Sequence, residues 1–321
     1  MSAARIIVVG AGHLGTYHLE KLTQHPGASL MGVVEPDAAR RDKATRRFEI
    51  PGYARLEAVD QPADAAIIAA PSTTHLELGL QALERGWDVL VEKPIADTVE
   101  AGQQLVARAA ARARILQVGH TERFNPAVAA AMATSDRPRY IVSERLGPFT
   151  GRSTDVDVVL DLMIHDLDIV GHLIPAELVE TRAIGVPVLT DAVDMASARL
   201  TFADGTVAQL SAGRASLEPV RKLRFFTAER YLSVDCASRE VKCVRRLPPA
   251  PGSSYPQLTG EPVDVDSGDA LQRQDAAFLH AVRTRAQPVV DGAAGLRALA
   301  LAEAVKHALY IPLDAQQPTS G

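Results

Sequence analysis

The chain has few cysteines, no surplus of basic residues and no long apolar run, and each absence argues against a class of protein. Two cysteines, Cys236 and Cys243, are too few in 321 residues for a disulfide framework, so reduced thiols are expected. The formal net charge of −5 leaves no excess of cations to neutralise phosphates, which argues against a nucleic-acid-binding protein. No uninterrupted apolar stretch approaches the length of a membrane span.

The beginning of the sequence also lacks the pattern of a secretory signal. An apolar strand starts at Ile6 with no long h-region or cleavage site before it, so a cytoplasmic protein is expected. The hydrophobic content of 47% and the charged content of 23% are typical of globular proteins. A chain of this length can form two domains, each with its own core.

Strands and helices alternate in the first part of the chain. Apolar strands are expected at residues 6–9, 30–34, 65–70, 87–91 and 115–118. Amphipathic segments between them fit crossover helices. Repeated β-α-β units predict a doubly wound parallel sheet, hence an α/β Rossmann domain over residues 1–120.

The pattern changes in residues 121–321. After helices near 126–134 and 157–173, strands follow one another without helices between them. They are expected at 178–188, 193–202, 206–214, 221–228, 230–234 and 239–246. This order predicts an α+β domain with an open, mainly antiparallel sheet. A Pro/Gly/Ser-rich loop over 248–262 and helices at 269–284 and 293–310 follow, and the last helix is expected to return toward the first domain.

A glycine motif stands between the first strand and the first helix, the context that dinucleotide binding requires. In Gly10-Ala11-Gly12-His13-Leu14-Gly15, the first glycine permits a tight turn. Gly12 lets the backbone approach a pyrophosphate, and Gly15 allows close helix–strand packing. The N–H groups at the helix N-terminus then face the phosphates. The motif alone is a weak indicator, because glycines also serve ordinary turns.

A carboxylate at the end of the second strand strengthens this interpretation. Glu35 lies 20 residues after Gly15, where an acid binds the adenosine ribose hydroxyls. A carboxylate there repels a 2′-phosphate, and the following Pro36-Asp37 supplies no cation, so NAD is favoured over NADP. A second wall of the cofactor site is expected after the 65–70 strand, at Ala70, Pro71, Ser72 and His75. The hydroxyls there could instead cap the next helix.

Two further motifs carry reactive side chains. Glu92-Lys93-Pro94 follows an apolar strand, and Asp161-x-x-x-His165 places a carboxylate and an imidazole four residues apart on a predicted helix. Oxidising an alcohol requires a base for the hydroxyl proton, and the pKa of histidine suits that task. Lys93 can stabilise negative charge on the substrate oxygen. Any one of these residues alone is more often structural.

The motifs occur in the order seen in the glucose–fructose oxidoreductase, inositol dehydrogenase and rhizopine-catabolism (Gfo/Idh/MocA) family, which the chain resembles over nearly its whole length. The resemblance implies that Lys93 and His165 face the nicotinamide of NAD and the sugar hydroxyl being oxidised, with Asp161 beside the histidine. It implies that Glu92 and Lys93 contact the cofactor. It also implies a homodimer or homotetramer that buries the open sheet, and no resident metal. Many relatives have glycines where this chain has bulkier residues at 158–160 and 163–164.

Two segments, 119–126 and 158–168, resemble the branch of that family that acts on nucleotide sugars. There Arg123 and Asn125 are expected to hold sugar or phosphate, because arginine forms forked bonds to phosphate. Arg145 and Arg152 are weaker candidates for a diphosphate. An inositol or free-sugar dehydrogenase is the alternative within the enzyme class, and a dinucleotide-binding regulator is the alternative outside it. The Asp/His stripe that continues to Asp168 and His172 is expected to be structural or peripheral.

Overall fold

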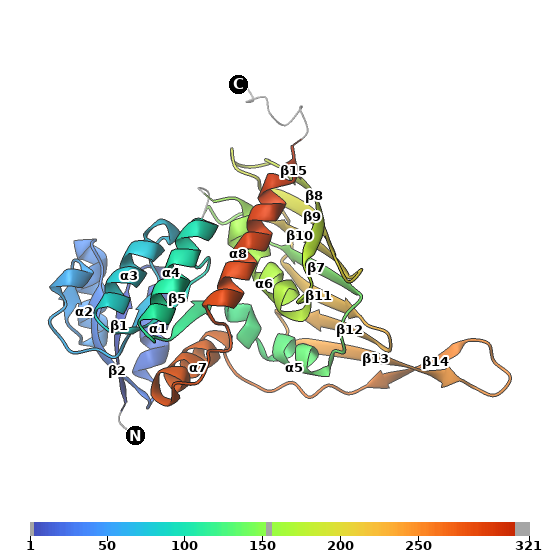
Figure 1. The fold of residues 1–321 in the computed structure, drawn as a ribbon, viewed down its shortest axis with the longest axis horizontal. Helices are drawn as coiled ribbons and strands as arrows, with labels where there is room; N and C mark the ends of the chain where they lie inside the picture. The colour runs from blue at the N-terminus through green and yellow to red at the C-terminus, as the bar shows by residue number, and fades with distance from the viewer. Residues whose placement is uncertain (1–2, 152–155, 312–321) are drawn as a thin grey trace. The chain divides into compact units, whose positions relative to one another are not determined.

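The computed structural model describes residues 3–151 and 156–311 (Figure 1). The chain forms two compact units. Among the described residues, the first contains those up to Phe124 together with Gly268–Leu299, and the second contains those of Asn125–Ser267 and of 300–311. Segments from both ends of the sequence therefore build the first unit.

Within the described residues, the first unit is built on a six-stranded sheet in the order β3-β2-β1-β4-β5-β6. The strands are β1 (Ala4–Val9), β2 (Ala28–Val34), β3 (Gly52–Tyr53), β4 (Ala65–Ile68), β5 (Asp88–Glu92) and β6 (Leu116–Gly119). Every pair is parallel. All residues of β4, β5 and β6 are buried, as expected for central strands of a parallel sheet that is covered on both faces. The predicted doubly wound parallel sheet is confirmed.

Helices connect these strands. They are α1 (His13–Thr23), α2 (Ala38–Phe48), α3 (His75–Glu84) and α4 (Val99–Ala111), with short 3₁₀ turns η1 (Leu56–Ala58), η2 (Ser72–Thr74) and η3 (Thr121–Phe124). The side chain of Asp37 accepts a hydrogen bond from the backbone N–H of Arg40, and that of Thr98 accepts one from Ala101. These N-caps fix where α2 and α4 begin.

The first unit is completed by a segment from near the end of the chain. It contains α7 (Ala270–Thr284) and the first half of α8 (Gly292–His307). Phe278 and Leu279 of α7 share a buried core with Ile6 of β1 and Leu19 of α1. Burying each such side chain stabilises the unit by roughly 1.5–3 kcal/mol. Helix α7 is therefore part of the core beneath the glycine loop.

The second unit begins with α5 (Pro126–Thr134), a π-helical turn η4 (Val159–Met163) and α6 (Ile164–Leu173). Its described residues form a nine-stranded sheet in the order β14-β13-β12-β11-β7-β10-β9-β8-β15. The strands are β7 (Tyr140–Leu146), β8 (Leu178–Val186), β9 (Met195–Phe202), β10 (Val207–Gly213), β11 (Val220–Phe226), β12 (Arg230–Asp235), β13 (Glu240–Pro249), β14 (Pro256–Glu261) and β15 (Leu309–Tyr310). The pairs β7–β10 and β8–β15 are parallel and the others antiparallel. The predicted mainly antiparallel sheet is confirmed.

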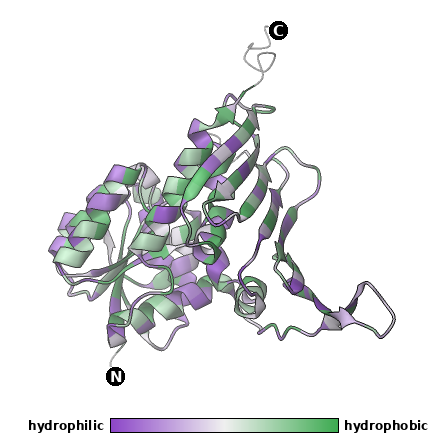
Figure 2. Ribbon diagram, turned by 45° about the vertical axis from the view of Figure 1, so that its right-hand side comes forward, coloured by the Kyte–Doolittle hydropathy of each residue, from purple (hydrophilic) through white to green (hydrophobic). Residues whose placement is uncertain are grey.

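Side chains alternate between the two faces of this sheet, and Figure 2 shows the matching alternation of apolar and polar residues along its strands. Ile141 of β7, Leu200 of β9 and Leu210 of β10 are fully buried on one face. Helix α5 packs against β12 and β13, and η4 packs against β10. On the other face, Phe226 lies against Tyr140 and Tyr231, with ring centroids 5.7 and 5.0 Å apart. We call this second side the open face.

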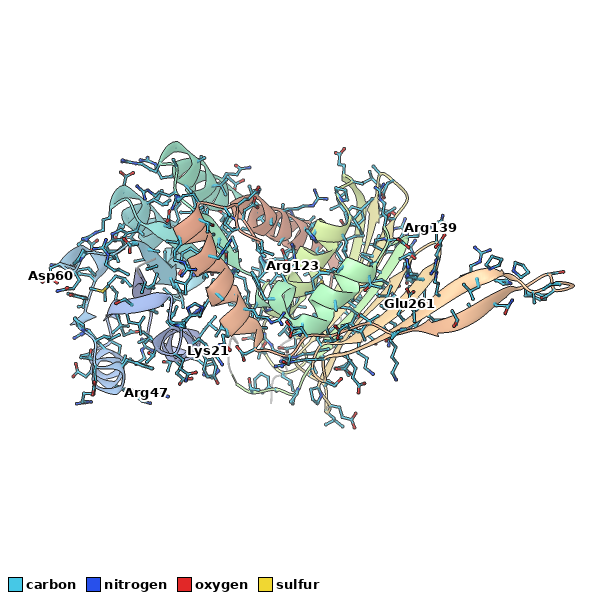
Figure 3. The ribbon with its side chains drawn as sticks, turned by 90° about the horizontal axis from the view of Figure 1, so that it is seen from below. Lys21, Arg47, Asp60, Arg123, Arg139 and Glu261 are labelled. Atoms are coloured by element: carbon cyan, nitrogen blue, oxygen red, sulfur yellow. The ribbon has the colours of Figure 1, made fainter. Side chains whose placement is uncertain are left out.

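Strands β13 and β14 form a hairpin at one edge of the second unit. The sequence predicts a loop over 248–262, whereas β14 occupies the end of that stretch. Nearly every residue of β14 is exposed, so no apolar alternation marks it. Glu261, labelled in Figure 3, accepts a hydrogen bond from Arg230 of β12 at the base of the hairpin.

No helix in the described part of the chain is both long and apolar enough to cross a membrane. Cys236 and Cys243 are both buried thiols, and burial raises the pKa of Cys243.

Candidate active site

The glycine loop joins β1 to α1, and its glycines meet different physical needs. Gly10 has φ +99°, a backbone conformation that side chains disfavour. A Cβ on Gly15 would collide with the carbonyl oxygen of Gly10, so only glycine lets the helix start so close to the loop. No described atom lies within 4 Å of a Cβ placed on Gly12. Gly12 is the N-cap of α1, so this open space adjoins the helix N-terminus, where N–H groups and the helix dipole favour a phosphate.

A cavity of about 730 Å³ opens beside this loop within the first unit. Gly10 and Gly12 line it together with Glu35 at the end of β2 and Ala70 and Pro71 after β4. It therefore lies at the carboxyl ends of neighbouring parallel strands, where such sheets bind ligands. Among the residues that the structure describes, its lining does not include the other predicted cofactor contacts, His13, Leu14, Gly15, Ser72, His75, Glu92 and Lys93.

Glu35 is 3% exposed and is bound by three donors. Its Oε2 accepts a hydrogen bond from the backbone N–H of Ala11 at 2.8 Å. Its Oε1 accepts from the N–H of Asp37 and from the guanidinium of Arg40, both at 3.0 Å. The carboxylate therefore ties the glycine loop to the start of α2. The sequence analysis considered only Pro36 and Asp37 as sources of a cation and missed Arg40. The signal is an arginine three residues after the N-cap aspartate, from where its side chain reaches the end of the preceding strand.

His75 connects the turn after β4 to the lysine motif. Its Nε2 lies 2.9 Å from the carbonyl oxygen of Ala70, and its Nδ1 lies 2.8 Å from that of Pro94. Burial lowers the pKa of His75, and the hydrogen bonds to these two carbonyl oxygens oppose that fall. The ring therefore bridges two loops, and its contact with the cofactor stays a prediction. In the described structure no side chain of η2 caps α3.

The lysine motif follows directly from β5. Glu92 is the last residue of that strand and is buried, Lys93 is half-buried, and the Lys93–Pro94 peptide bond is cis. The Oε1 of Glu92 lies 3.1 Å from Nε2 of His18 and 2.8 Å from Nε2 of Gln274. The backbone thus delivers Lys93 at the carboxyl end of a parallel strand, while the Glu92 carboxylate is engaged inside the unit.

Sequence reasoning missed His120, which follows β6 at the same edge of the sheet. His120 is fully buried, and burial, followed by the charges of Lys93 and Arg123, lowers its pKa to about 3. The ring is therefore neutral at physiological pH and lies in the electrostatic field of both cations. Arg123, labelled in Figure 3, is in η3 and is only 4% exposed. The position of His120 just past a strand end is a signal that finds it.

Asp161 and His165 lie in the second unit, but not in the single helix expected near 157–173. Asp161 is in the π-helical turn η4, and His165 is the second residue of α6. The carboxylate of Asp157 starts this turn by accepting the N–H groups of Val159 and Leu160, each at 3.0 Å. A π turn changes the angle between successive residues, so a spacing of four residues does not by itself place two side chains on one face. That Asp161 and His165 share a face therefore stays a prediction. Such turns are frequent at functional sites.

Four of the five bulkier residues that distinguish this segment belong to the core of the second unit, and the fifth, Leu160, is half-buried. Val158, Val159, Met163 and Ile164 are all fully buried. They therefore fill the space between η4, α6 and the sheet, while Asp161 and His165 remain partly exposed.

The other predicted polar contacts serve mainly the architecture of the second unit. Asn125 is the N-cap of α5, where its side chain accepts from the N–H of Ala127 and donates to the carbonyl oxygen of Cys236. Arg145 is buried and forms a bidentate pair with Asp166, with N–O distances of 2.7 and 3.1 Å. That pairing commits its guanidinium to the core. Arg152 lies outside the described residues.

The Asp/His stripe of α6 divides between core and surface. Asp168 is 2% exposed, whereas His172 is exposed. Within residues 3–151 and 156–311, no group of three or more His, Cys, Asp or Glu side chains is arranged to hold a metal ion.

The residues around the cavity fit a dinucleotide. The open space at Gly12 and the N-terminus of α1 suit a pyrophosphate, and the carboxylate of Glu35 at the end of β2 suits ribose hydroxyls. Nicotinamide dinucleotides have both groups. The first unit is therefore built to bind NAD.

Comparison with known proteins agrees with this geometry. Residues 4–120 match the Gfo/Idh/MocA family, described as an oxidoreductase family with an NAD-binding Rossmann fold. The chain is 37% identical over 304 residues to the UDP-N-acetylglucosamine 3-dehydrogenase of Acidithiobacillus ferrooxidans, covering 94% of this chain and 96% of that protein. A solved structure of that dehydrogenase superposes with a TM-score of 0.89 at 36% identity, over 96% of this chain and 98% of that one.

A second relative is more distant. The NAD-dependent scyllo-inositol 2-dehydrogenase of Bacillus subtilis is 30% identical over 231 residues, which cover 66% of this chain and 68% of that protein. The family match, the full-length relative and the cofactor cavity thus agree, and the chain belongs to the Gfo/Idh/MocA family of NAD-dependent oxidoreductases.

Proposed function

We propose that this protein oxidises the 3-hydroxyl of UDP-N-acetylglucosamine to a 3-oxo sugar nucleotide, with NAD as the hydride acceptor. The observation that carries the proposal is the 37% identity to a dehydrogenase of that substrate over 94% of the chain. The match includes both units rather than the dinucleotide domain alone. A ketone at that carbon is a substrate for transamination, as in a pathway of the lipid A type.

The reaction assigns one task to each predicted side chain. NAD, when bound, accepts the hydride from the carbon that carries the hydroxyl. The imidazole of His165 takes the hydroxyl proton, and Asp161 orients or polarises that imidazole. The ammonium of Lys93 donates a hydrogen bond to the substrate oxygen and stabilises the charge that develops there. Arg123 and Asn125 remain the proposed contacts to the sugar nucleotide.

The electrostatics of the first unit support the role of Lys93. Burial and the neighbouring cations keep His120 neutral, so this ring adds no positive charge beside the lysine. The half-buried lysine follows the last residue of a fully buried strand, which leaves its backbone little freedom. A hydrogen-bond donor that is held in place before the reaction stabilises developing charge most effectively.

An inositol or free-sugar dehydrogenase is the second candidate. It is favoured by the 30% identity to the scyllo-inositol 2-dehydrogenase, but that match covers only 66% of this chain. A regulator that binds NAD without turnover is the alternative of another class. The presence of Lys93 and His165 argues against it, because a binding protein has no need of either.

The protein is also proposed to be a homodimer or homotetramer that buries the open face. Phe226 on that face is 36% exposed and Ile184 is 43% exposed. Exposed aromatic and aliphatic side chains on one sheet surface are typical of a protein–protein interface.

The direct test mixes the protein with NAD and UDP-N-acetylglucosamine and follows NADH absorbance, with a trap for the ketone because the equilibrium can be unfavourable. We expect NADH formation and a nucleotide sugar that is lighter by two hydrogens in mass spectrometry. Parallel reactions with scyllo-inositol, myo-inositol and free N-acetylglucosamine separate the first two candidates. Binding of NAD without turnover on any of these substrates supports the regulator and overturns the proposal.

A further inference from the structure

A buried polar network lies behind Lys93, and the proposed reaction does not use it. His18 of α1 is fully buried. Its Nδ1 lies 2.8 Å from a carboxylate oxygen of Asp275 on α7, and its Nε2 lies 3.1 Å from one of Glu92. Gln274, also on α7, donates to the same Glu92 oxygen at 2.8 Å.

The partners of His18 fix its protonation. Ionised carboxylates only accept hydrogen bonds, so both ring nitrogens must carry hydrogen and the ring is a cation. Burial alone lowers the pKa of His18, but the charge and hydrogen bond of Asp275, together with those of Glu92, outweigh it and raise the pKa to about 10. Burial raises the pKa of the Asp275 carboxyl, and the charge of His18 opposes that rise. An imidazolium thus joins two carboxylates at the core of the unit.

The network continues beyond Glu92. The hydroxyl of Thr121 donates to the side-chain oxygen of Gln274 at 2.8 Å, and Gln117 donates to the Gln274 backbone oxygen at 3.1 Å. A Cβ on Gly119 would collide with the Glu92 carboxyl, so glycine at this end of β6 makes room for the carboxylate. The conformation of Glu92 is therefore set by α1, α7 and β6 at once.

The residues directly before and after Lys93 are both fixed by hydrogen bonds. Glu92 before it is fixed by His18 and Gln274, and the carbonyl oxygen of Pro94 after it lies 2.8 Å from His75. These contacts fix the residues on either side of Lys93 in the chain. A charged network of this kind is costly to bury, and this one fixes the residue directly before Lys93.

We propose that His18, Asp275 and Gln274 are positioning residues that hold Glu92 and thereby fix where the Lys93 ammonium lies. Helix α7, almost 180 residues after Lys93 in the sequence, is on this view part of the catalytic apparatus. The inference rests on the proposed function only through the role of Lys93, and its effect on the lysine can be measured without turnover.

The experiment uses His18→Gln and Asp275→Asn in the full-length protein. Lysines are converted to ¹³C-dimethyl-lysine, and the Lys93 signal is identified by its loss in Lys93→Arg. We expect both variants to shift this signal and to lower kcat roughly tenfold to a hundredfold, the scale of a misplaced reacting group. The KM for NAD should stay within about threefold, since the network does not line the cofactor cavity.

The matched control is Asp88→Asn, because Asp88 and Glu92 are the first and last residues of β5. Asp88 is 2% exposed and pairs with Arg285 just after α7, so its loss removes a buried carboxylate from the same strand. We expect it to lower stability while leaving the Lys93 signal and kcat unchanged.

The outcomes separate the two proposals. A wild-type protein that does not oxidise UDP-N-acetylglucosamine contradicts the proposed function, yet the Lys93 signal still decides this inference. If the Lys93 signal has the same chemical shift in His18→Gln and Asp275→Asn as in the control Asp88→Asn, the positioning role is wrong. If His18→Gln does not fold, Gln274→Met replaces it, because this variant removes the other hydrogen bond to Glu92. The Lys93 signal of Gln274→Met then tests the positioning role in the same way.

Discussion

Cofactor choice at Glu35 depends on a pair of residues rather than on one carboxylate. Because Arg40 lies 3.0 Å from the Glu35 oxygen, the carboxylate also neutralises a cation that a 2′-phosphate would otherwise attract. We expect Glu35→Ser to weaken NAD binding about tenfold, or about 1.4 kcal/mol, and to strengthen NADP binding. Titration with each dinucleotide measures both dissociation constants.

Glu57→Ser is a suitable control for that variant, since Glu57 lines the same cavity without contacting the glycine loop in the described hydrogen bonds. It should leave the ratio of the two constants unchanged. Wild-type protein that binds NADP as tightly as NAD would show that Glu35 does not contact the ribose.

Lys93 and His165 should matter for turnover and not for holding NAD. We expect Lys93→Ala and His165→Ala each to lower kcat about a hundredfold, or about 2.7 kcal/mol, the scale of a positioned acid–base or oxyanion group. NAD affinity should persist because neither residue lines the cavity. Lys43→Ala on α2 and His172→Ala on α6 are matched controls on exposed positions, and turnover in them should match wild type. Near-normal turnover in either test variant would refute the mechanism.

His18 gives the stability of the first unit a defined pH dependence. Its pKa is about 10 in the folded protein and near 6.5 when unfolded, so the folded state binds one more proton between these values. Stability from this group is complete below the unfolded pKa and is lost as pH rises, by up to about 1.4 kcal/mol per pH unit. The charges that face it are Glu92 of β5 and Asp275 of α7, and His25 acts on Asp275.

Urea unfolding at about pH 7 and about pH 9 measures this dependence. The wild type should lose more free energy of unfolding over that interval than His18→Gln. Equal losses in the two proteins would show that the ring is not an extra cation in the folded state.

At the level of elements, the sequence predicts those strands in which apolar residues form one face. It does not predict strands in which polar residues interrupt the alternation of apolar and polar positions. Strand β7 is absent from the predicted strands because Ser143 and Arg145 occupy its buried positions. Arg145 is paired there with Asp166, which lies 21 residues away. Strand β14 is exposed at nearly every residue and has no periodicity to detect. The π turn at η4 has no local sequence signature of its own.

The candidate site shows the same division. Glycine geometry at Gly10 and Gly15 and the place of Glu35 follow from local rules, so the sequence predicts them. The network around Glu92 joins α1, β5 and α7, and no local pattern reveals which distant helix packs against a given strand. The sequence therefore finds α7 but not its role.

The N-terminus of α7 offers a test of an element on which this network depends. The side chain of Asp269 accepts the N–H of Gln272 at 2.9 Å, and its ion pair with Lys21 at 3.4 Å is largely exposed. We expect Asp269→Ala to lower the free energy of unfolding by about 1 kcal/mol, mostly through loss of the cap. Urea denaturation measures it, with NAD affinity expected to be unchanged. An unfolding midpoint equal to wild type would show that the cap contributes nothing.

For the molecule as a whole, the open face predicts self-association. We expect light scattering at micromolar concentration to give the mass of a dimer or tetramer. Phe226→Glu should shift that mass toward the monomer, because it buries a charge in the expected interface. Leu217→Glu, at a loop residue that is 97% exposed, should not. A monomeric wild type would contradict the predicted assembly.

The return of the chain to the first unit has a consequence for its synthesis on the ribosome. The sheet of residues 4–119 emerges early, but the Phe278 side chain that fills its core leaves the ribosome only after most of the second unit has been made. At roughly 5–20 residues per second, this delay lasts on the order of ten to thirty seconds. During that interval the nascent chain exposes an apolar surface awaiting a helix not yet translated, which makes this half of the protein a natural client for chaperones acting during translation.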